Sequence, residues 1–337
     1  MYEKVKSHLL EGSASSLYNN LDVFIEDSEK DLNGGYDRMS FATVSKTNVS
    51  LVHYHRNGKI TTSQVTNTQS KNCTALQARW CSLGHQDVLV VANFEGFLVY
   101  DSDGQLKLFW YSPSSEENLA DGKSYCRAIT CVSGKFICVG RFDGKVMVIM
   151  ANKNTFSVCK TLHGHSTPIT ATDGLNNADN GDKVDFISAD DSGTICTYRS
   201  SDEFEFVAMI PGSSVPCTSI KLLCNGLIAG GFLTGHIRIF DPVEATMLSE
   251  ITAHTRAVSC MDATIDKEAS LLICGSEDSF IRVWKVTRDD TITVTHEWSA
   301  SIRDIQICGA KFCDPLGQAF AVSGYDSKEI MQFSRVY

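Results

Sequence analysis

A few residues of this 337-residue chain are of types that perform chemistry, and their spacing tests each possibility. His163 and His165 form a His-x-His pair, but no carboxylate or third histidine stands at metal-ligand spacing. Two cysteine pairs lie in apolar runs with four residues between the members, Cys126 with Cys131 and Cys308 with Cys313. Neither pair has Cys-x-x-Cys spacing, so we interpret them as structural thiols and expect no metal site.

Phosphate-binding and nucleophile motifs are incomplete. The sequence DGKS at 121–124 resembles the end of a phosphate-binding loop, but Glu117 stands where the required glycine would be, five residues before Gly122. The glycine-rich segment 230–235 lies between two apolar runs and opens no helix, which predicts a hairpin turn. There is no Gly-x-Ser-x-Gly motif, although a Ser-His-Asp or Cys-His group assembled from distant segments stays open. We therefore predict that the protein is not an enzyme and has no cofactor.

The composition narrows the class of protein further. A net charge of −10 argues against nucleic acid as a partner, because binding to phosphates needs a basic surface. The first ten residues, MYEKVKSHLL, lack the apolar core of a signal peptide, and no apolar run approaches the roughly 18 residues needed to span a bilayer. We therefore expect most of the 13 cysteines to be free thiols. These features favour a cytoplasmic protein without membrane insertion.

The elements that position these residues form a repeat. An apolar run, a tight polar turn and a second apolar run with a large last residue occur seven times. The last residues of the copies are Tyr54, Tyr100, Ile149, Tyr198, Phe240, Trp284 and Phe333. They are 42 to 49 residues apart, and each copy predicts a β-hairpin. Further strand-like runs between the copies, for example 203–210 and 292–298, bring each unit to four strands. The pattern predicts an all-β, seven-bladed propeller of four-stranded antiparallel blades, with residues 1–337 as one domain.

The two ends of the sequence suggest how the ring closes. The seventh copy ends near Ser334, so no sequence remains for the outer strand of the last blade. A strand-like run at 3–10 could supply it by pairing with that blade, which would leave no long sheet edge open. The alternative is that this run is a disordered tail.

A family resemblance rests on particular motifs. Ala253-His254 followed by Asp278 and Trp284 resembles the repeat of WD-repeat propellers. Segments outside that repeat resemble the WD repeat-containing protein 54 family: GSASSLYNNL, GKFICVG, SADDSG, IPGSSVPC and CGAKFCDPLGQAFAVSGYDSKEI. The resemblance implies an intracellular seven-bladed propeller that serves as an interaction module, and it does not imply an enzymatic activity.

The same resemblance implies hydrogen-bonded chains inside two blades. In the family, a histidine, a serine or threonine, an aspartate and a tryptophan are linked in each blade, and a buried carboxylate does need such donors. The matching residues are His165, Ser188, Asp191 and Tyr198 in the fourth copy, and His254, Asp278 and Trp284 in the sixth. The match is imperfect, because Cys274 occupies the serine position of the sixth copy and Tyr198 replaces tryptophan in the fourth. We expect apolar packing to hold the other blades.

The face that bears the hairpin turns is the predicted contact surface. The residue before each turn aspartate, or its equivalent, should project from this face together with residues that follow the two histidines. These residues are Phe142, Thr170, Asp190, Leu233, Arg256, Glu277 and Tyr325. Their aromatic and charged character is typical of protein-binding hot spots.

Three hypotheses follow for the function. The first is a non-enzymatic scaffold or adaptor that binds proteins or peptides on this face. The second is a propeller hydrolase or a small-ligand site, which requires inward-facing polar residues that converge in the central channel. The third is self-association through exposed strand edges or faces.

Overall fold

The structure is a computed structural model. It describes residues 1–27, 36–66, 73–113, 125–152, 155–176, 183–201, 203–223, 225–264 and 269–336. The DGKS segment at 121–124 lies outside the described residues. No helix in the described part of the chain is long and apolar enough to cross a bilayer.

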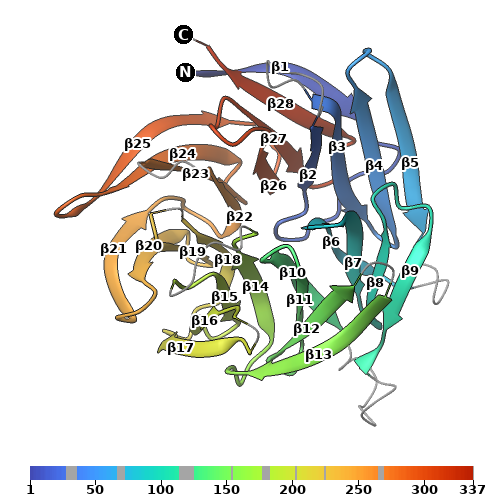
Figure 1. The fold of residues 1–337 in the computed structure, drawn as a ribbon. Helices are drawn as coiled ribbons and strands as arrows, with labels where there is room; N and C mark the ends of the chain where they lie inside the picture. Colours follow the sequence, from blue (N-terminus) through green and yellow to red (C-terminus); the bar gives the residue numbers. More distant parts are fainter. Residues whose placement is uncertain are drawn as a thin grey trace.

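The described strands form seven four-stranded antiparallel sheets, which are arranged around a central axis (Figure 1). We call the sheets blades 1 to 7 in chain order, and the first strand of each blade the inner strand. Blade 1 consists of β2 (Asp22–Asp27), β3 (Tyr36–Ser45), β4 (Asn48–His55) and β5 (Ile60–Thr66). Blade 2 consists of β6 (Ala75–Leu83), β7 (Gln86–Asn93), β8 (Gly96–Asp101) and β9 (Lys107–Tyr111). Blade 3 consists of β10 (Cys126–Val132), β11 (Phe136–Arg141), β12 (Lys145–Asn152) and β13 (Thr155–His163). Blade 4 consists of β14 (Ile169–Gly174), β15 (Phe186–Asp190), β16 (Ile195–Arg199) and β17 (Glu205–Ile210).

The remaining blades follow the same order. Blade 5 consists of β18 (Cys217–Leu222), β19 (Ile228–Phe232), β20 (His236–Asp241) and β21 (Thr246–Thr252). Blade 6 consists of β22 (Val258–Ala263), β23 (Ala269–Ser276), β24 (Phe280–Arg288) and β25 (Ile292–Ser301). Blade 7 consists of β26 (Ile307–Phe312), β27 (Ala319–Gly324), β28 (Glu329–Arg335) and the N-terminal strand β1 (Tyr2–Leu9). The prediction of seven four-stranded antiparallel blades is confirmed.

The predicted hairpins are the second and third strands of the blades. The large residue that ends each copy lies in the third strand, and in six blades it lies at a β-bulge against the outer strand. A bulge bends the strand and increases its twist, so a large side chain is needed at the same place to fill the space beside it. The repeat in the sequence therefore marks a repeated irregularity of the blade.

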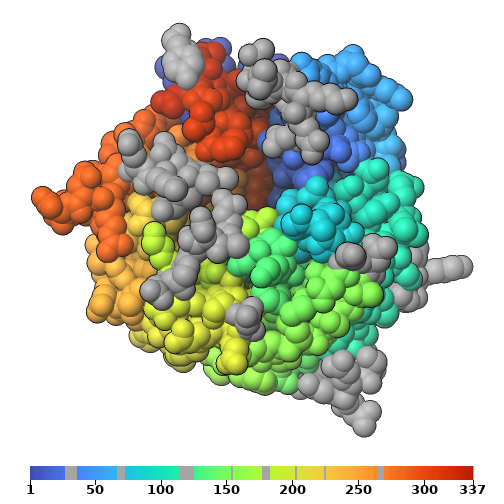
Figure 2. All heavy atoms as spheres, in the orientation of Figure 1, coloured from blue at the N-terminus to red at the C-terminus, as the bar shows by residue number. Residues whose placement is uncertain are grey.

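The N-terminal strand closes the ring. β1 pairs antiparallel with β28, from Tyr2 opposite Arg335 to Leu9 opposite Glu329. The bulge that the other outer strands show is present here too, beside Phe333. Figures 1 and 2 show the blue N-terminal and red C-terminal segments side by side. The closure predicted from residues 3–10 is confirmed, and the tail interpretation is wrong.

The core lies between the blades. Buried apolar residues form seven clusters, and each cluster joins two neighbouring blades, including blade 7 with blade 1. Phe41, Phe97, Phe186, Phe232 and Phe320 are among the largest fully buried side chains. Each blade thus depends on both neighbours, which makes a closed ring a rigid frame for its loops.

Candidate functional site

One turn position is held in the same way in most blades. It is the residue directly after the second strand, which we call the first turn residue. In blades 2 to 7 its backbone amide donates to the carbonyl of a residue just before or at the start of the inner strand, at 2.8–3.3 Å. These first turn residues are Phe94, Phe142, Asp191, Leu233, Glu277 and Tyr325. We call the surface that bears them the turn face.

The predicted contact residues have different environments on this face. Tyr325 and Leu233 are 52% and 44% exposed, and Arg256 is exposed as well, on three different blades. Glu277 is half-buried and accepts a hydrogen bond from the Tyr18 hydroxyl at 3.2 Å. The Thr170 hydroxyl donates to carbonyls of blades 4 and 5, so it joins two blades.

An aromatic cluster on blades 2 and 3 surrounds Phe142. Its ring packs edge-on against Tyr125 with centroids 4.8 Å apart, and Tyr125 contacts Phe94 in the same way at 5.8 Å. The guanidinium of Arg127 lies 6.0 Å from the centre of the Tyr125 ring and forms an ion pair with Asp191 at 3.3 Å. Sequence reasoning missed Phe94 and Tyr125. Phe94 could have been found because it occupies the same turn position as Phe142.

The fourth blade corrects one assignment. His165 Nδ1 lies 3.0 Å from a carboxylate oxygen of Asp190, whose side chain is 1% exposed, and not against Asp191. Asp191 is an exposed first turn residue and pairs with Arg127. The predictions that placed Asp191 in the buried chain and Asp190 on the contact face are therefore wrong. The reason is that the carboxylate reaching His165 comes from the end of β15, one residue before the turn.

The Asp190 carboxylate is well supplied with donors. Besides His165, it accepts hydrogen bonds from the Ser192 and Thr194 amides, both at 2.9 Å, and from the Ser192 hydroxyl at 2.7 Å. Although burial opposes ionisation, the bonds from His165 and Ser192 hold the pKa of Asp190 below its ordinary value. On the other side of the ring, His165 Nε2 lies 2.8 Å from the Ser188 hydroxyl. Histidine, serine and aspartate thus form a continuous buried chain in this blade.

The sixth blade builds a similar chain with a thiol. His254 Nδ1 lies 3.1 Å from both carboxylate oxygens of Asp278, and its Nε2 lies 3.1 Å from Cys274 Sγ. This order resembles a Cys-His-Asp catalytic group, but Cys274 is fully buried and burial raises the pKa of its thiol to about 12. Burial also lowers the pKa of His254 to about 4. A neutral thiol beside a neutral imidazole suits a structural chain and not a nucleophile.

The aromatic residue of each chain lies beside the last polar member, Tyr198 beside Ser188 and Trp284 beside Cys274. The Trp284 indole N–H and the Tyr198 hydroxyl are buried, and neither makes a hydrogen bond of good geometry with the described residues. The Trp284 ring instead packs edge-on against His296, with centroids 5.2 Å apart. Both aromatic residues therefore contribute packing at the ends of the two chains.

The segment from Glu11 to Leu21 crosses the turn face between β1 and β2. Its Asn19 amide donates to the Ser259 carbonyl at 2.9 Å, and the Asn19 side chain bonds Thr218 and Ser219. The side chain of Asn20 donates to the Val44 carbonyl at 3.0 Å. These bonds tie the segment to blades 1, 5 and 6, so the GSASSLYNNL sequence lies over one end of the channel.

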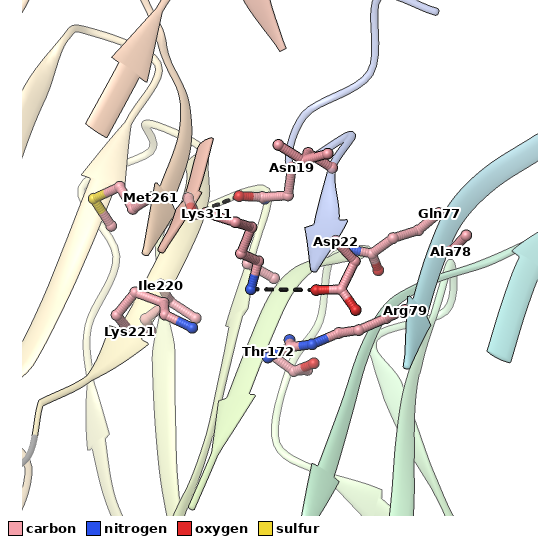
Figure 3. A pocket seen from close by; sticks show the side chains of 13 residues that line it. Asn19, Asp22, Gln77, Ala78, Arg79, Thr172, Ile220, Lys221, Met261 and Lys311 are labelled. Carbon is pink, nitrogen blue, oxygen red and sulfur yellow. Dashed lines mark hydrogen bonds and ion pairs between the residues drawn. The ribbon is translucent and has the colours of Figure 1, made fainter. Parts of the chain in front are cut away.

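The channel wall carries six alternating charges, which we call the charge ring. Its members come from six inner strands and are Asp22, Arg79, Asp173, Lys221, Asp262 and Lys311. Successive charged atoms from Arg79 through to Asp22 lie 2.9–3.5 Å apart. Figure 3 shows Asp22 and Lys311 directed toward each other, with Arg79 close by. The charge ring was not predicted from the sequence.

The three carboxylates of the charge ring share one further contact. Each accepts the backbone amide that follows a cationic residue in a neighbouring blade, at 2.8–3.0 Å. The acceptors and donors are Asp22 with Trp80, Asp173 with Leu222, and Asp262 with Phe312. Although burial opposes ionisation, Lys311 and Lys221 lower the pKa of Asp262 to about 2. The ring therefore consists of ionised, paired groups that link blade to blade.

A shared position in the inner strands could have indicated the ring. In blades 2, 4, 5, 6 and 7 the charged residue is the fifth residue of the inner strand. Blade 3 has the neutral Thr130 at this position, and the long side chain of Arg79 reaches past that blade to Asp173 at 3.4 Å. A single charge at a constant place in otherwise apolar runs is the signal that was available.

The central cavity is small, and both polar and apolar groups line it. Its volume is about 30 Å³, enough for water but not for an organic substrate, and the described residues that line it include no histidine. Among the described residues there is no cluster of three or more His, Cys, Asp or Glu side chains that could hold a metal ion. His163 and His165 do not act as a pair, because His165 belongs to the buried chain of blade 4. Because no histidine is among the described residues that line the cavity, the cluster of histidine, aspartate and nucleophile that would favour the channel hypothesis is not found there.

Comparisons with known proteins agree with this architecture. The chain is 38% identical over 267 residues to mouse WD repeat-containing protein 54, which covers 77% of this chain and 78% of the relative. It is 33% identical over 347 residues to rat WD repeat domain 54, over the full length of both chains. Among solved structures, a chain of the mitotic checkpoint complex matches with a TM-score of 0.73, 14% identity and coverage of 99% of this chain and 92% of that one.

A second solved structure supports the fold in the same way. The WD40 β-propeller domain of Doa1 matches with a TM-score of 0.70 and 15% identity, over 100% of this chain and 97% of that one. The sequence pattern of the family described as WDR54 matches residues 1–336. The family pattern matches nearly the whole chain, and two mammalian relatives are 33% and 38% identical to it, so the chain belongs to the WDR54 family of WD-repeat propellers.

Proposed function

We propose that the protein is a non-enzymatic scaffold of the cytoplasm, in which residues 1–337 act as one domain and the turn face binds proteins or peptides. The observation that carries the proposal is the repeated anchoring of the first turn residues. Their amides are fixed to the inner strands, while several of their side chains are apolar and exposed, above all Phe94, Leu233 and Tyr325. Exposed aromatic and aliphatic side chains on a rigid frame lose little entropy when a partner binds.

Two further observations support an interaction role. WD-repeat propellers are generally scaffolds, and one propeller of similar fold was solved as part of a multiprotein assembly, the mitotic checkpoint complex. The charged residues near the aromatic cluster are Arg127 and Asp191, which already neutralise each other at 3.3 Å. A partner is therefore recognised mainly by apolar contact, with Arg256 as an exposed charge that can select an acidic group.

The experiment compares three tagged versions of the full chain in affinity capture from cells. The test variant is Phe142→Ala with Tyr325→Ala, which removes one half-buried and one exposed ring from the turn face. The control is Met247→Ala, because Met247 is 54% exposed but lies on the outer strand β21. We expect partners to be retained by the original chain and the control and lost from the test variant, with nearly equal melting temperatures.

A direct binding measurement then follows with one such partner in purified form. We expect calorimetry to show at least a tenfold weaker affinity for the test variant, since losing hot-spot rings costs more than about 1.4 kcal/mol. Equal capture by all three versions would place the contact surface elsewhere. Loss of capture together with loss of folding would remove the support for the turn face.

A further inference from the structure

The inner strands of blades 2 and 3 are held side by side by polar bridges. The Arg79 guanidinium donates to the Ile129 carbonyl at 2.8 Å, and the Gln77 side-chain oxygen accepts the Ile129 amide at 2.8 Å. Further along, the Gly84 amide donates to the Gly134 carbonyl at 2.7 Å. These bonds fix β6 and β10 at matching levels on both sides of one pair of residues, Cys81 and Cys131.

The two thiols between these bridges contact each other. Cys131 packs against the buried apolar cluster between blades 2 and 3, and Cys81 is a member of that cluster. Cys81 is completely buried, whereas Cys131 is only half-buried. Both are free thiols. The arrangement puts a half-buried cysteine next to a fully buried one, and such a pair can be oxidised stepwise.

The surroundings also favour the thiolate form of Cys131. The hydrogen bond from Cys81, the charge of Arg79 and the Ser82 backbone lower the pKa of Cys131, although burial works against ionisation. The same hydrogen bond and burial raise the pKa of Cys81. By contrast, burial raises the pKa of most other described cysteines: Cys126, Cys138, Cys159, Cys196, Cys217, Cys260, Cys274, Cys308 and Cys313.

We propose that Cys131 is a peroxide-sensitive thiol that forms a disulfide with Cys81 and thereby links blades 2 and 3 covalently. The oxidant is hydrogen peroxide or an organic hydroperoxide. The Cys131 thiolate attacks one peroxide oxygen, the O–O bond breaks, and with one proton the leaving oxygen departs as water or alcohol, which leaves a sulfenic acid. The Cys81 sulfur then attacks the sulfenic sulfur, the S–O bond breaks, and its thiol proton leaves with the hydroxyl as water. Two thiols and one hydrogen peroxide thus give one disulfide and two molecules of water, and an organic hydroperoxide gives one disulfide, one water and one alcohol.

The link has a structural consequence at the charge ring. Arg79 precedes Cys81 by two residues on β6, so both lie on the same side of that strand. Blade 3 contributes no charge to the charge ring, and the side chain of Arg79 spans that blade. A disulfide at this place restrains β6 against β10 beside that gap. We expect the oxidised ring to melt at a higher temperature than the reduced ring, because the cross-link restricts the unfolded chain.

The test uses the full chain, hydrogen peroxide, alkylation of free thiols and trypsin digestion without reductant. Cleavage after Arg79 and Arg127 puts Cys81 in the peptide 80–107 and Cys131 in the peptide 128–135, separate from Cys126. We expect mass spectrometry to find these two peptides linked after mild peroxide, and separate again after dithiothreitol. The Cys159→Ser control, which removes an exposed thiol, should give the same link.

Two single substitutions distinguish the roles of the pair. Cys131→Ser should abolish the link and leave Cys81 reduced, because the peroxide reacts first at position 131. Cys81→Ser should leave a sulfenic acid at Cys131 that dimedone traps, and melting curves verify that both variants fold. Three results would each overturn the proposal. They are a Cys131 that reacts no faster than the buried thiols, a disulfide that joins Cys131 to another cysteine, and direct overoxidation of Cys131 in the original chain.

Discussion

Replacing Lys221 with methionine tests the charge ring most directly. Lys221 Nζ lies 2.9 Å from Asp173 and 3.1 Å from Asp262, and these carboxylate side chains are only 6% and 11% exposed. The substitution keeps most of the apolar stem and removes the charge that both carboxylates share. Breaking a buried ion pair by removing one partner costs about 3–5 kcal/mol, because an uncompensated charge stays buried. Here each carboxylate keeps a second cation and an amide donor, so we expect about 3 kcal/mol, the low end of that range.

The assay is urea unfolding of the full chain, with Lys4→Met as the matched control. Lys4 also forms an ion pair, with Glu329 at 3.7 Å, but both side chains are 46% exposed. Exposed pairs contribute about 0–1 kcal/mol, so the control should unfold close to the original midpoint. If Lys221→Met costs no more than Lys4→Met, the channel charges are effectively solvated and the charge ring does not hold the blades together.

The chains within the blades give two further predictions. Asp190→Ala should lower the free energy of unfolding by about 1–3 kcal/mol, because it leaves buried donors unpaired. Asp191→Ala should lower it by under about 1 kcal/mol, because it removes only an exposed ion pair. If thermal melting shows Asp191→Ala to be the less stable variant, Asp191 belongs to the buried chain after all. His254 must be neutral in the folded protein, where its pKa is about 4, whereas its pKa in the unfolded chain is 6.5. The stability that His254 contributes is therefore complete above pH 6.5 and is lost as pH falls toward 4. When the pH falls from 7.5 to 5, protonation of this histidine should lower the free energy of unfolding by about 2 kcal/mol. In urea unfolding, the stability of His254→Gln should therefore depend less on pH than that of the original chain. Parallel curves would mean that His254 is not buried as described.

The blade number and the ring closure could be predicted because both depend on local sequence patterns. Each hairpin has its own turn residues, and the large residue at the end of each copy repeats at nearly constant spacing. The closure followed from a missing outer strand in the last blade and a spare strand-like run at the start of the chain. That run has the register and the bulge of an ordinary outer strand. These inferences needed no knowledge of which side chains meet across the ring.

The choice between Asp190 and Asp191 failed for the opposite reason. The two are adjacent, and counting back from Tyr198 cannot tell whether a carboxylate belongs to the end of β15 or to the turn. In the sixth blade Asp278 reaches its histidine from the turn itself, so the sixth blade was a misleading template. Only the pairing of Ile169 with Asp190 in the fourth blade shows which aspartate lies beside the inner strand.

The charge ring and the cysteine pair depend on contacts between distant parts of the chain. Closeness in sequence suggests Cys126 as the partner of Cys131, whereas its partner in the structure is Cys81, in the neighbouring blade. Adjacent inner strands run side by side with their residues at matching levels, so the useful comparison is between equal positions of successive repeats. That comparison would have aligned Arg79, Asp173 and Lys221 without any structure.

The junction between blades 7 and 1 shows why these distant contacts matter for the fold. The N-terminal strand leaves blade 7 at Leu9, and the following segment enters blade 1 at Asp22, so the chain joins these blades as it joins any other pair. Lys311 of blade 7 then forms an ion pair with Asp22 at 3.5 Å, and the Ser323 hydroxyl donates to the Asn20 carbonyl at 2.7 Å. The connecting segment and the channel wall are thus both bonded across the same junction. Because each blade of a closed ring depends on both neighbours, these bonds help the junction between blades 7 and 1 to support the turn face.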